Sequence, residues 1–570
     1  QEVLMVYFGA GVGGVASTIF FDIIYRAYFV HSPFAWSAKI CETPLALLVP
    51  NWLAPPPGSP VYKLRSMLHT EFLPCITIMV LWLILQLIAN LSLSMIITRV
   101  LVEMERMPFP FAEVSVSIID LISERQAEIM RVFFMYMFVG LIYSFILYVG
   151  PTVLGMQLIP LPYVDLVWLI RDYLPGAILG IATPLSSYFS GFVMPFNVAI
   201  CMLITSIVIY ILFNSAFTTV WCGFFPEWTK EYFRGMGLIA LQNRALIRIW
   251  LVPQIGFGIS AALYTIYKVR RTVYSMLRVM VNPSEEKTIL GFPSIRLLLL
   301  MYVLPVTSSI AIYHYLIPDI PIWIPIFASL IYGFLMSLMV TAMQGVTGFT
   351  LPLPPYLWQA LVYLSPYKGY AGFVFSPIIP GLGVGASPWV FAQRTKVALM
   401  TRTKPIDLVK LAIIAPLLAW ILNFFSLNIF WSIAPMPSSV YPYTVYFMPQ
   451  RAQMETFFVT RQLDVRASYI IFATVITFII ALLGDLLNKI GIPFSALGFF
   501  LGLYTLPTTA IPLFIGSLLS NVIMPRIYGR STWRKIRGIA VAGEMVGEGT
   551  VITFLLSLTL LFRATWVWPW

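Results

Sequence analysis

Long apolar segments recur along the whole chain and are separated by short polar gaps. A helix needs about 20 mostly apolar residues to cross the hydrocarbon core of a bilayer. Segments of that kind lie near residues 3–28, 75–99, 132–155, 192–216, 247–268, 294–316, 321–344, 408–433, 467–487, 507–525 and 540–562. These lengths predict an all-α polytopic membrane protein with about 11–12 transmembrane helices.

The charge of the chain agrees with that class. Only 10% of the residues are charged, whereas a soluble domain carries about 25%. A net charge of +12 would suggest nucleic-acid binding in a soluble protein, but the cytoplasmic loops of membrane proteins collect Lys and Arg. We therefore place the basic segments 268–278, 394–404 and 526–537 in the cytoplasm. We expect no nucleic-acid partner and predict a multi-pass protein of the plasma membrane.

Several kinds of function are excluded by the motifs that the sequence lacks. The four cysteines are scattered and the three histidines form no group with metal-ligand spacing, so we expect no metal and no other cofactor. The sequence contains no HExxH, nucleotide-binding loop or GxSxG motif, which predicts neither an enzyme nor an ATP-driven pump. The sequence begins at Gln1 without a Met, so we expect some N-terminal residues to be missing.

Four apolar stretches rich in Pro and Gly are too short to cross a membrane comfortably. They lie at 107–122, 174–189, 351–365 and 492–507. Matched interruptions in two halves of a membrane protein point to a transporter's binding site. We predict two related halves, 1–280 and 290–570, each with two of these short helices, and a polar loop insertion at 434–466. The alternative is that membrane proteins reuse Gly and Pro often.

Hydroxyl side chains cluster in two segments that occupy corresponding places, 180–187 and 502–509. Broken helices offer unpaired N-terminal amides that can bind a carboxylate, and hydroxyls and tyrosines beside them are expected to line the same cavity. Each hydroxyl alternatively satisfies the backbone of a kinked helix. The substrate-binding candidates are Thr183, Ser186, Ser187, Tyr188, Tyr504, Thr505, Thr508 and Thr509.

Acidic residues inside apolar segments are the candidates for proton coupling. Glu544 and Glu548 are four residues apart, so both carboxyl groups lie on one helix face. A low dielectric favours the neutral form of a carboxyl group, a like charge one turn away adds to this, and such a pair can share a proton. Alternatively, Glu544 is an interfacial acid near a helix N-terminus.

Three further acidic positions are open to more than one interpretation. Glu113 and Asp120 lie on one face of the first short helix, where either could receive a proton, a cation or a peptide's ammonium group, although Asp120 also fits a solvated helix end. Asp485 is a further proton-coupling candidate near the end of an apolar segment, and position 482 lacks the glycine of an intramembrane aspartyl protease. Asp22 and Arg26 are predicted to form a structural ion pair.

Several motifs resemble those of one family of membrane proteins. The stretches GLYTLPTTAIPLFIGSLL (502–519) and GIAVAGEMVGEGTV (538–551) look like the C-terminal signature of the oligopeptide transporter family, with Gly547, Glu548 and Gly549 matching its last element. MPFPFAEVSVSIID (107–120), GVTG (345–348) and residues 391–419 are similar to other motifs of the family, in its order. The similarity is to a prokaryotic-type member. Phe111, Phe349 and Thr508 depart from the family pattern at segments expected to face the substrate.

The resemblance implies a secondary active transporter, a proton-coupled symporter of short peptides or metal-chelate complexes that works by alternating access. Its partners would be the small-molecule substrate, protons and the lipid bilayer, with a homo-oligomer or an accessory membrane subunit left open. Two rival functions remain. One is an uncoupled channel or facilitator, and the other is a non-transporting membrane scaffold that retains the transporter fold.

Overall fold

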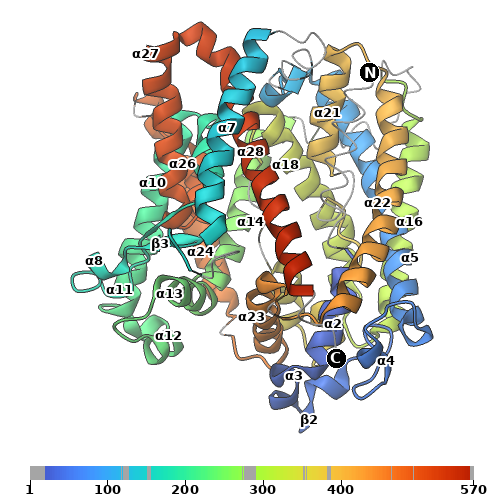
Figure 1. The fold of residues 1–570 in the computed structure, drawn as a ribbon. Coiled ribbons are helices and arrows are strands. Elements are labelled where there is room, and N and C mark those ends of the chain that lie inside the picture. The colour runs from blue at the N-terminus through green and yellow to red at the C-terminus, as the bar shows by residue number, and fades with distance from the viewer. Residues whose placement is uncertain are drawn as a thin grey trace.

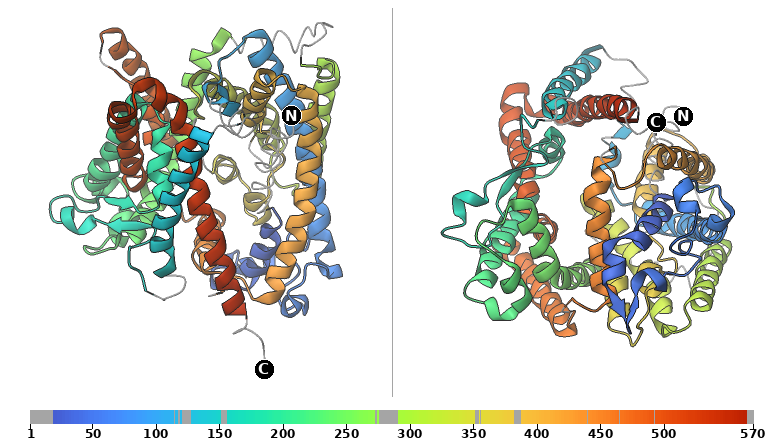
Figure 2. Two further views of the ribbon diagram at one scale, coloured as in Figure 1. Left: turned by 45° about the horizontal axis from the view of Figure 1, so that its top comes forward. Right: turned by 60° about the horizontal axis from the view of Figure 1, so that its bottom comes forward.

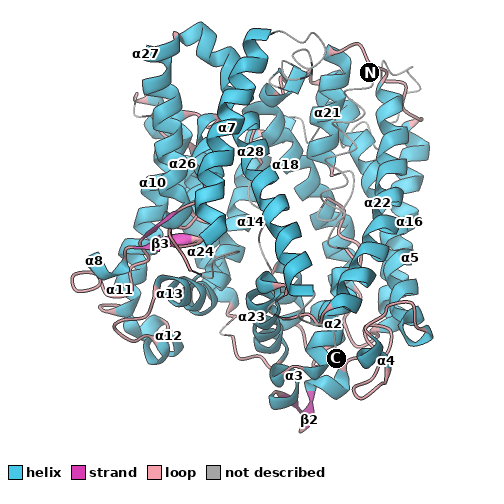
Figure 3. Ribbon diagram, viewed as in Figure 1, coloured by secondary structure: helices cyan, strands magenta, loops and turns pink. Residues whose placement is uncertain are grey.

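The computed structural model describes residues 19–564 except 114, 117–118, 120–126, 151–155, 272–273, 275–289, 351–353, 355, 382–386, 439, 464 and 492. This part of the chain is mostly helical (Figure 3). It contains two small antiparallel sheets, β1 (Lys39–Ile40) with β2 (Thr43–Pro44) and β3 (Tyr163–Asp165) with β4 (Gly180–Ala182). In the second sheet Tyr163 pairs with Ala182.

Ten helical segments in the described part are long and apolar enough to cross a membrane, which confirms the predicted class of fold. They are Thr70–Met104, Met130–Val149, Phe196–Thr218, Leu238–Lys268, Ile295–Leu316, Trp323–Val346, Pro405–Ile433, Ala467–Lys489, Pro507–Tyr528 and Arg530–Leu555. The predicted segment 3–28 lies mostly outside the described residues, and helix α2 (Phe21–His31) covers its end.

The long helices form two bundles (Figures 1 and 2). The first bundle contains α5 (Leu73–Thr98), α16 (Ile295–Leu316), α18 (Gly333–Thr347), α21 (Pro388–Met400) and α22 (Pro405–Ile433). The second bundle contains α7 (Ala127–Val149), α10 (Phe196–Ile207), α14 (Leu251–Lys268), α24 (Ala467–Lys489), α26 (Pro507–Leu518) and α28 (Arg530–Ala564). Each bundle takes helices from both predicted halves, so neither half forms a bundle by itself.

Short helices connect and cover the bundles. They are α3 (Pro33–Ser37), α4 (Val61–Leu64), α8 (Val167–Ile170), α11 (Asn214–Thr218), α12 (Pro226–Glu231), α13 (Leu238–Ala245), α17 (Trp323–Ile326), α20 (Ala371–Val374) and α27 (Met524–Tyr528). The two bundles meet where α14 packs on α18. Helix α21, which carries much of the basic segment 394–404, and the junction of α27 with α28, which carries 526–537, lie at the same end of the molecule (Figure 1).

The four short Pro/Gly stretches take different forms. Residues 351–365 contain α19 (Leu357–Tyr363) and residues 492–507 contain α25 (Ala496–Gly502). Residues 174–189, predicted as one short helix, contain strand β4 followed by α9 (Leu185–Phe192). Proline explains that change, because Pro184 has no N–H to donate within a helix and its extended φ and ψ place it at the N-cap of α9. Much of 107–122 lies outside the described residues.

The predicted polar loop at 434–466 is mostly helical, since α23 (Pro442–Val459) occupies its centre. Helix α23 packs against α2, α3, α19 and α20 at the base of the first bundle. Its buried residues include Met448, Ala452 and Phe458. The polar composition that suggested a loop reflects charged side chains that α23 directs toward α2, as described below.

Candidate functional site

Glycines set the contact between α7 and α28, the pair of helices that carries the candidate carboxyl groups (Figure 1). A β-carbon at Gly543 would lie 3.2 Å from the backbone nitrogen of Met137, and one at Gly547 would lie 2.8 Å from that of Leu141. The two helices therefore run parallel with their backbones in contact. Two glycines four residues apart allow this close approach in membrane proteins, where small residues replace the hydrophobic effect as the basis of helix association.

Glu548 is buried at this contact, with 5% of its surface exposed. Its carboxylate accepts a hydrogen bond from the hydroxyl of Tyr148 on α7 at 3.0 Å and another from the backbone N–H of Ser186 at 3.1 Å. Ser186 is the second residue of α9, so its amide is one of those that an isolated helix leaves unpaired. Glu548 therefore binds the helix terminus that the sequence suggested for a substrate carboxylate.

Glu544 is fully buried one helical turn before Glu548. Neither oxygen of its carboxyl group has a hydrogen-bond partner within the part of the chain that the structure describes. An unpaired carboxylate in such surroundings is costly, and the neutral protonated form avoids much of that cost. The interpretation of Glu544 as a helix N-terminal acid is wrong, because α28 begins at Arg530, more than three turns earlier.

Two of the candidate hydroxyls around α9, those of Thr183 and Tyr188, donate to backbone carbonyl oxygens. Thr183 donates to the carbonyl oxygens of Pro160 and Pro162 at 3.0 and 3.1 Å. Tyr188 donates to the carbonyl oxygen of Ala182 at 3.1 Å. Ser187 is half-buried in the first turn of α9. These bonds fix the turn that aims the amide of Ser186 at Glu548.

The two matched segments lie against each other. A β-carbon at Gly180 would lie 3.1 Å from the side chain of Thr508. Helices α9 and α26 cross closely where Tyr188 meets Gly516, and they run in the same direction, since the end of α9 lies toward the end of α26, where Ser520 donates to the carbonyl oxygen of Phe192. Sequence position alone predicted that these segments correspond, and the structure brings them together within the second bundle.

The candidates at the start of α26 have mixed surroundings. Tyr504 donates its hydroxyl to the carbonyl oxygen of Gln254, and Thr505 donates to that of Leu501 at 2.8 Å. Thr508 is fully buried, and its hydroxyl has no hydrogen-bond partner among the described residues. Thr509 is half-buried on the next position.

Asp485 and Glu113 do not join the pair on α28. Asp485 accepts a hydrogen bond from Tyr264 at 2.9 Å and forms an ion pair with Lys268 at 2.7 Å, which ties the ends of α14 and α24 together. Glu113 is exposed on the first short helix, and Asp120 falls outside the described residues. Among the sequence-predicted candidates, Glu544 and Glu548 lie together on α28, and Glu548 binds the amide of Ser186 and the hydroxyl of Tyr148.

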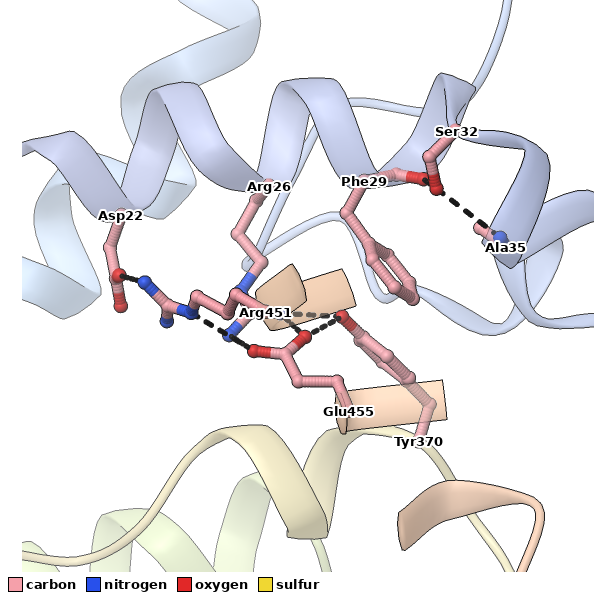
Figure 4. A network of polar contacts seen from close by, with 8 residues as sticks. All are labelled: Asp22, Arg26, Phe29, Ser32, Ala35, Tyr370, Arg451 and Glu455. Carbon is pink, nitrogen blue, oxygen red and sulfur yellow. Dashed lines mark hydrogen bonds and ion pairs between the residues drawn. The ribbon is translucent and has the colours of Figure 1, made fainter. Parts of the chain in front are cut away.

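A partly buried network of charges joins α2 to α23 (Figure 4). Arg26 forms an ion pair with Glu455 at 2.6 Å and donates to the hydroxyl of Tyr370 at 2.6 Å. Arg451 pairs with Asp22 at 2.6 Å. The predicted pair between Asp22 and Arg26 is wrong, because each binds a partner on α23 rather than its neighbour on α2. The spacing of four residues between Arg451 and Glu455 was the available signal for this network.

The arrangement defines the class of protein: a multi-pass integral membrane protein of two helical bundles, with broken helices and buried carboxyl groups within one bundle. A family model described as OPT oligopeptide transporter protein matches residues 58–560, which include both bundles. The chain belongs to the oligopeptide transporter family, and this points to a transporter rather than an enzyme. No curated protein matched the chain in a direct search.

Proposed function

We propose that this protein is a proton-coupled symporter of short peptides that works by alternating access in the plasma membrane. A metal-chelate complex is the second substrate class. The observation that carries the proposal is the carboxyl pair on α28: Glu548 holds two hydrogen-bond donors, and Glu544 is fully buried without one among the described residues. Ionisable groups inside membrane segments mark proton and ion pathways.

The bond between Glu548 and Ser186 offers a physical route to coupling. Ionised Glu548 holds the N-terminal amide of α9. When Glu548 takes up a proton, this hydrogen bond weakens, because a charged acceptor binds about twice as strongly as a neutral one. The amide then becomes available to the terminal carboxylate of a peptide, with the neighbouring Ser187 and the hydroxyls of α26 as further contacts. Proton and substrate thereby favour each other's binding.

The experiment is uptake of a mixed tri- to pentapeptide pool by liposomes that contain the purified protein, with and without an inward proton gradient. Glu548→Gln and Glu544→Gln would be compared with wild type and with Glu227→Gln. Glu227 is a matched control because it is exposed on α12 and pairs with Lys230. We expect gradient-driven uptake to be lost in Glu548→Gln and retained in Glu227→Gln.

The other outcomes separate the rival functions. Uptake that ignores the gradient in wild type and survives in Glu548→Gln would identify an uncoupled facilitator. Gradient-driven uptake that is retained in Glu548→Gln but lost in Glu544→Gln would assign the coupling role to Glu544. Absence of uptake for peptides and for metal chelates would favour the scaffold.

One observation favours the scaffold as a second candidate function. Phe111 and Phe349 make an edge-to-face contact with ring centroids 5.1 Å apart, and Phe111 also covers Gly348. Bulky side chains thus fill the contact between the first short helix and the end of α18. Phe111→Ala distinguishes the two functions: in a transporter it should open a gradient-independent leak, whereas in a scaffold it should leave the liposomes tight.

A further inference from the structure

A cavity of about 520 Å³ lies between the end of α26, the short helix α27 and the first turns of α28. Three arginines line it: Arg530, Arg534 and Arg537. Their spacing of four and three residues places all three on one face of α28. The cavity is at the end of the second bundle where α27 lies (Figure 1), away from the polar contacts of Glu548.

The positive charge of this arginine cavity has no counter-ion among the described residues. No ion pair within the described part of the chain includes any of the three arginines. The Nε atom of Arg537 is buried and has no hydrogen-bond partner among the described residues. Grouping three guanidinium ions without an anion is unfavourable, because like charges repel and a buried N–H group without an acceptor costs free energy.

The walls that hold the arginines are themselves fixed by hydrogen bonds. Trp533, which is 2% exposed, donates its indole N–H to the hydroxyl of Ser520 at 3.1 Å, and Ser520 donates to the carbonyl oxygen of Phe192 at 2.7 Å. Asn521 donates to the carbonyl oxygen of Met194 at 3.0 Å. The start of α28 is thus held against α26 and the end of α9, so the geometry of the cavity is set in advance of any ligand.

We propose that the arginine cavity binds a phosphate-bearing anion. The planar fork of a guanidinium group matches phosphate oxygens with two parallel hydrogen bonds, and three such groups on one wall exceed what a single carboxylate can satisfy. The cavity has room for a phosphate group with a substituent attached. Arg530 and Arg534 are exposed, which leaves it open to a ligand from outside.

Two kinds of ligand carry such a phosphate group: an anionic phospholipid, in its headgroup, and a soluble phosphate compound. The surroundings favour the lipid: Ile523 and Ile527, at 40% and 66% exposed, flank the lining residue Pro525 in sequence at the end of a membrane span. Apolar side chains beside a basic cavity at that level fit acyl chains and a headgroup together. A ligand bound in the arginine cavity would also restrain the part of α28 that lies about two turns before Glu544.

The test measures lipid retention by the full-length protein. Protein extracted from vesicles of equal phosphatidylglycerol and phosphatidylcholine would be washed in detergent, and its bound lipid quantified by native mass spectrometry. The variants are Arg534→Gln, Arg537→Gln and, as the matched control, Lys535→Gln, which is exposed on α28 and does not line the cavity. In a parallel experiment, the unfolding temperature of the delipidated protein is measured at increasing concentrations of inorganic phosphate, and chloride at the same ionic strength serves as the control.

For a lipid site, we expect the ratio of retained phosphatidylglycerol to phosphatidylcholine to fall about tenfold in Arg534→Gln, the loss typical of one charge-assisted hydrogen bond. Lys535→Gln should retain the wild-type ratio. Phosphate stabilisation that is lost in Arg534→Gln, without lipid selectivity, would support a soluble ligand. The proposal is overturned if neither lipid nor phosphate distinguishes Arg534→Gln from Lys535→Gln. Arg534 is exposed, so this variant stays informative even if Arg537→Gln fails to fold.

Discussion

Gly547 and Gly549 differ by two positions on α28 and offer a direct test of the contact that positions the carboxyl pair. At Gly547 a β-carbon would lie 2.8 Å from the backbone nitrogen of Leu141 and closer still to the carbonyl oxygen of Met137. At Gly549 it would meet nothing within 4 Å. Replacing either glycine with alanine adds the same methyl group to the same helix, so the intrinsic helix gain of up to about 1 kcal/mol is common to both variants.

The difference between Gly547→Ala and Gly549→Ala therefore isolates the packing between α7 and α28. The obstacle at position 547 is backbone, which cannot rotate away as a side chain can. The helices must separate by about 0.5–1 Å to restore van der Waals contact, and overpacking of this kind costs about 1–3 kcal/mol. Because Tyr148 reaches Glu548 from α7 at 3.0 Å, the same separation should lengthen that hydrogen bond.

The assay is thermal unfolding of both variants in one detergent, together with peptide uptake. We expect Gly549→Ala to unfold at or above the wild-type temperature, and Gly547→Ala to unfold below it with reduced uptake. If the two variants were equally stable, α7 and α28 would not be in backbone contact, and the described geometry of Glu548 would have to be abandoned.

Three further variants test other parts of the structure. Glu455→Gln should destabilise the protein by about 3–5 kcal/mol, because it leaves Arg26 buried without its counter-ion; a wild-type unfolding temperature would contradict this. Asp485→Asn should cost less than about 1 kcal/mol, since its partner is 43% exposed, and full loss of uptake would instead give Asp485 a role in transport. Burial raises the pKa of Glu231, but hydrogen bonds from Arg248 and a second arginine outweigh burial and lower it. The resulting stability is present above the unfolded-state pKa and fades as pH falls through the folded-state pKa, so the stability gap between wild type and Glu231→Gln should shrink from pH 7 to pH 4, and a constant gap would refute the assignment.

The class of fold could be predicted from the sequence because a membrane imposes its own length scale. Apolar runs of about 20 residues mark spanning helices whatever their neighbours are, and the ten described spans lie on ten of the predicted segments. The arrangement of the spans could not be predicted in the same way. The pairing of α7 with α28, and of α5 with α16, depends on the complementary shapes of helix surfaces that are far apart in sequence, and no local sequence pattern indicates it.

For the candidate site, too, one part could be predicted from the sequence and another could not. The face shared by Glu544 and Glu548 follows from helical periodicity alone. Their different surroundings do not, since Glu548 is bonded by residues from α7 and α9, about 400 and 360 positions away in sequence. The prediction of a polar loop at 434–466 missed helix α23 and the partners of its charged residues. A polar stretch looked like a loop, because the spacing of Arg451 and Glu455 on one helix face does not indicate that Asp22 and Arg26, more than 400 positions away, would be their partners.

The sequence by itself determined that the chain spans a membrane many times, where its helices lie, which acids share a face and which family it resembles. These properties depend on hydrophobicity, periodicity and short motifs, which act between near neighbours. The tertiary structure alone decided that each bundle combines both halves, that α9 directs an amide at Glu548 and that three arginines enclose a cavity beside α27. Those features arise from contacts between distant segments, where shape and the pairing of buried charges select one arrangement among many that the sequence pattern allows.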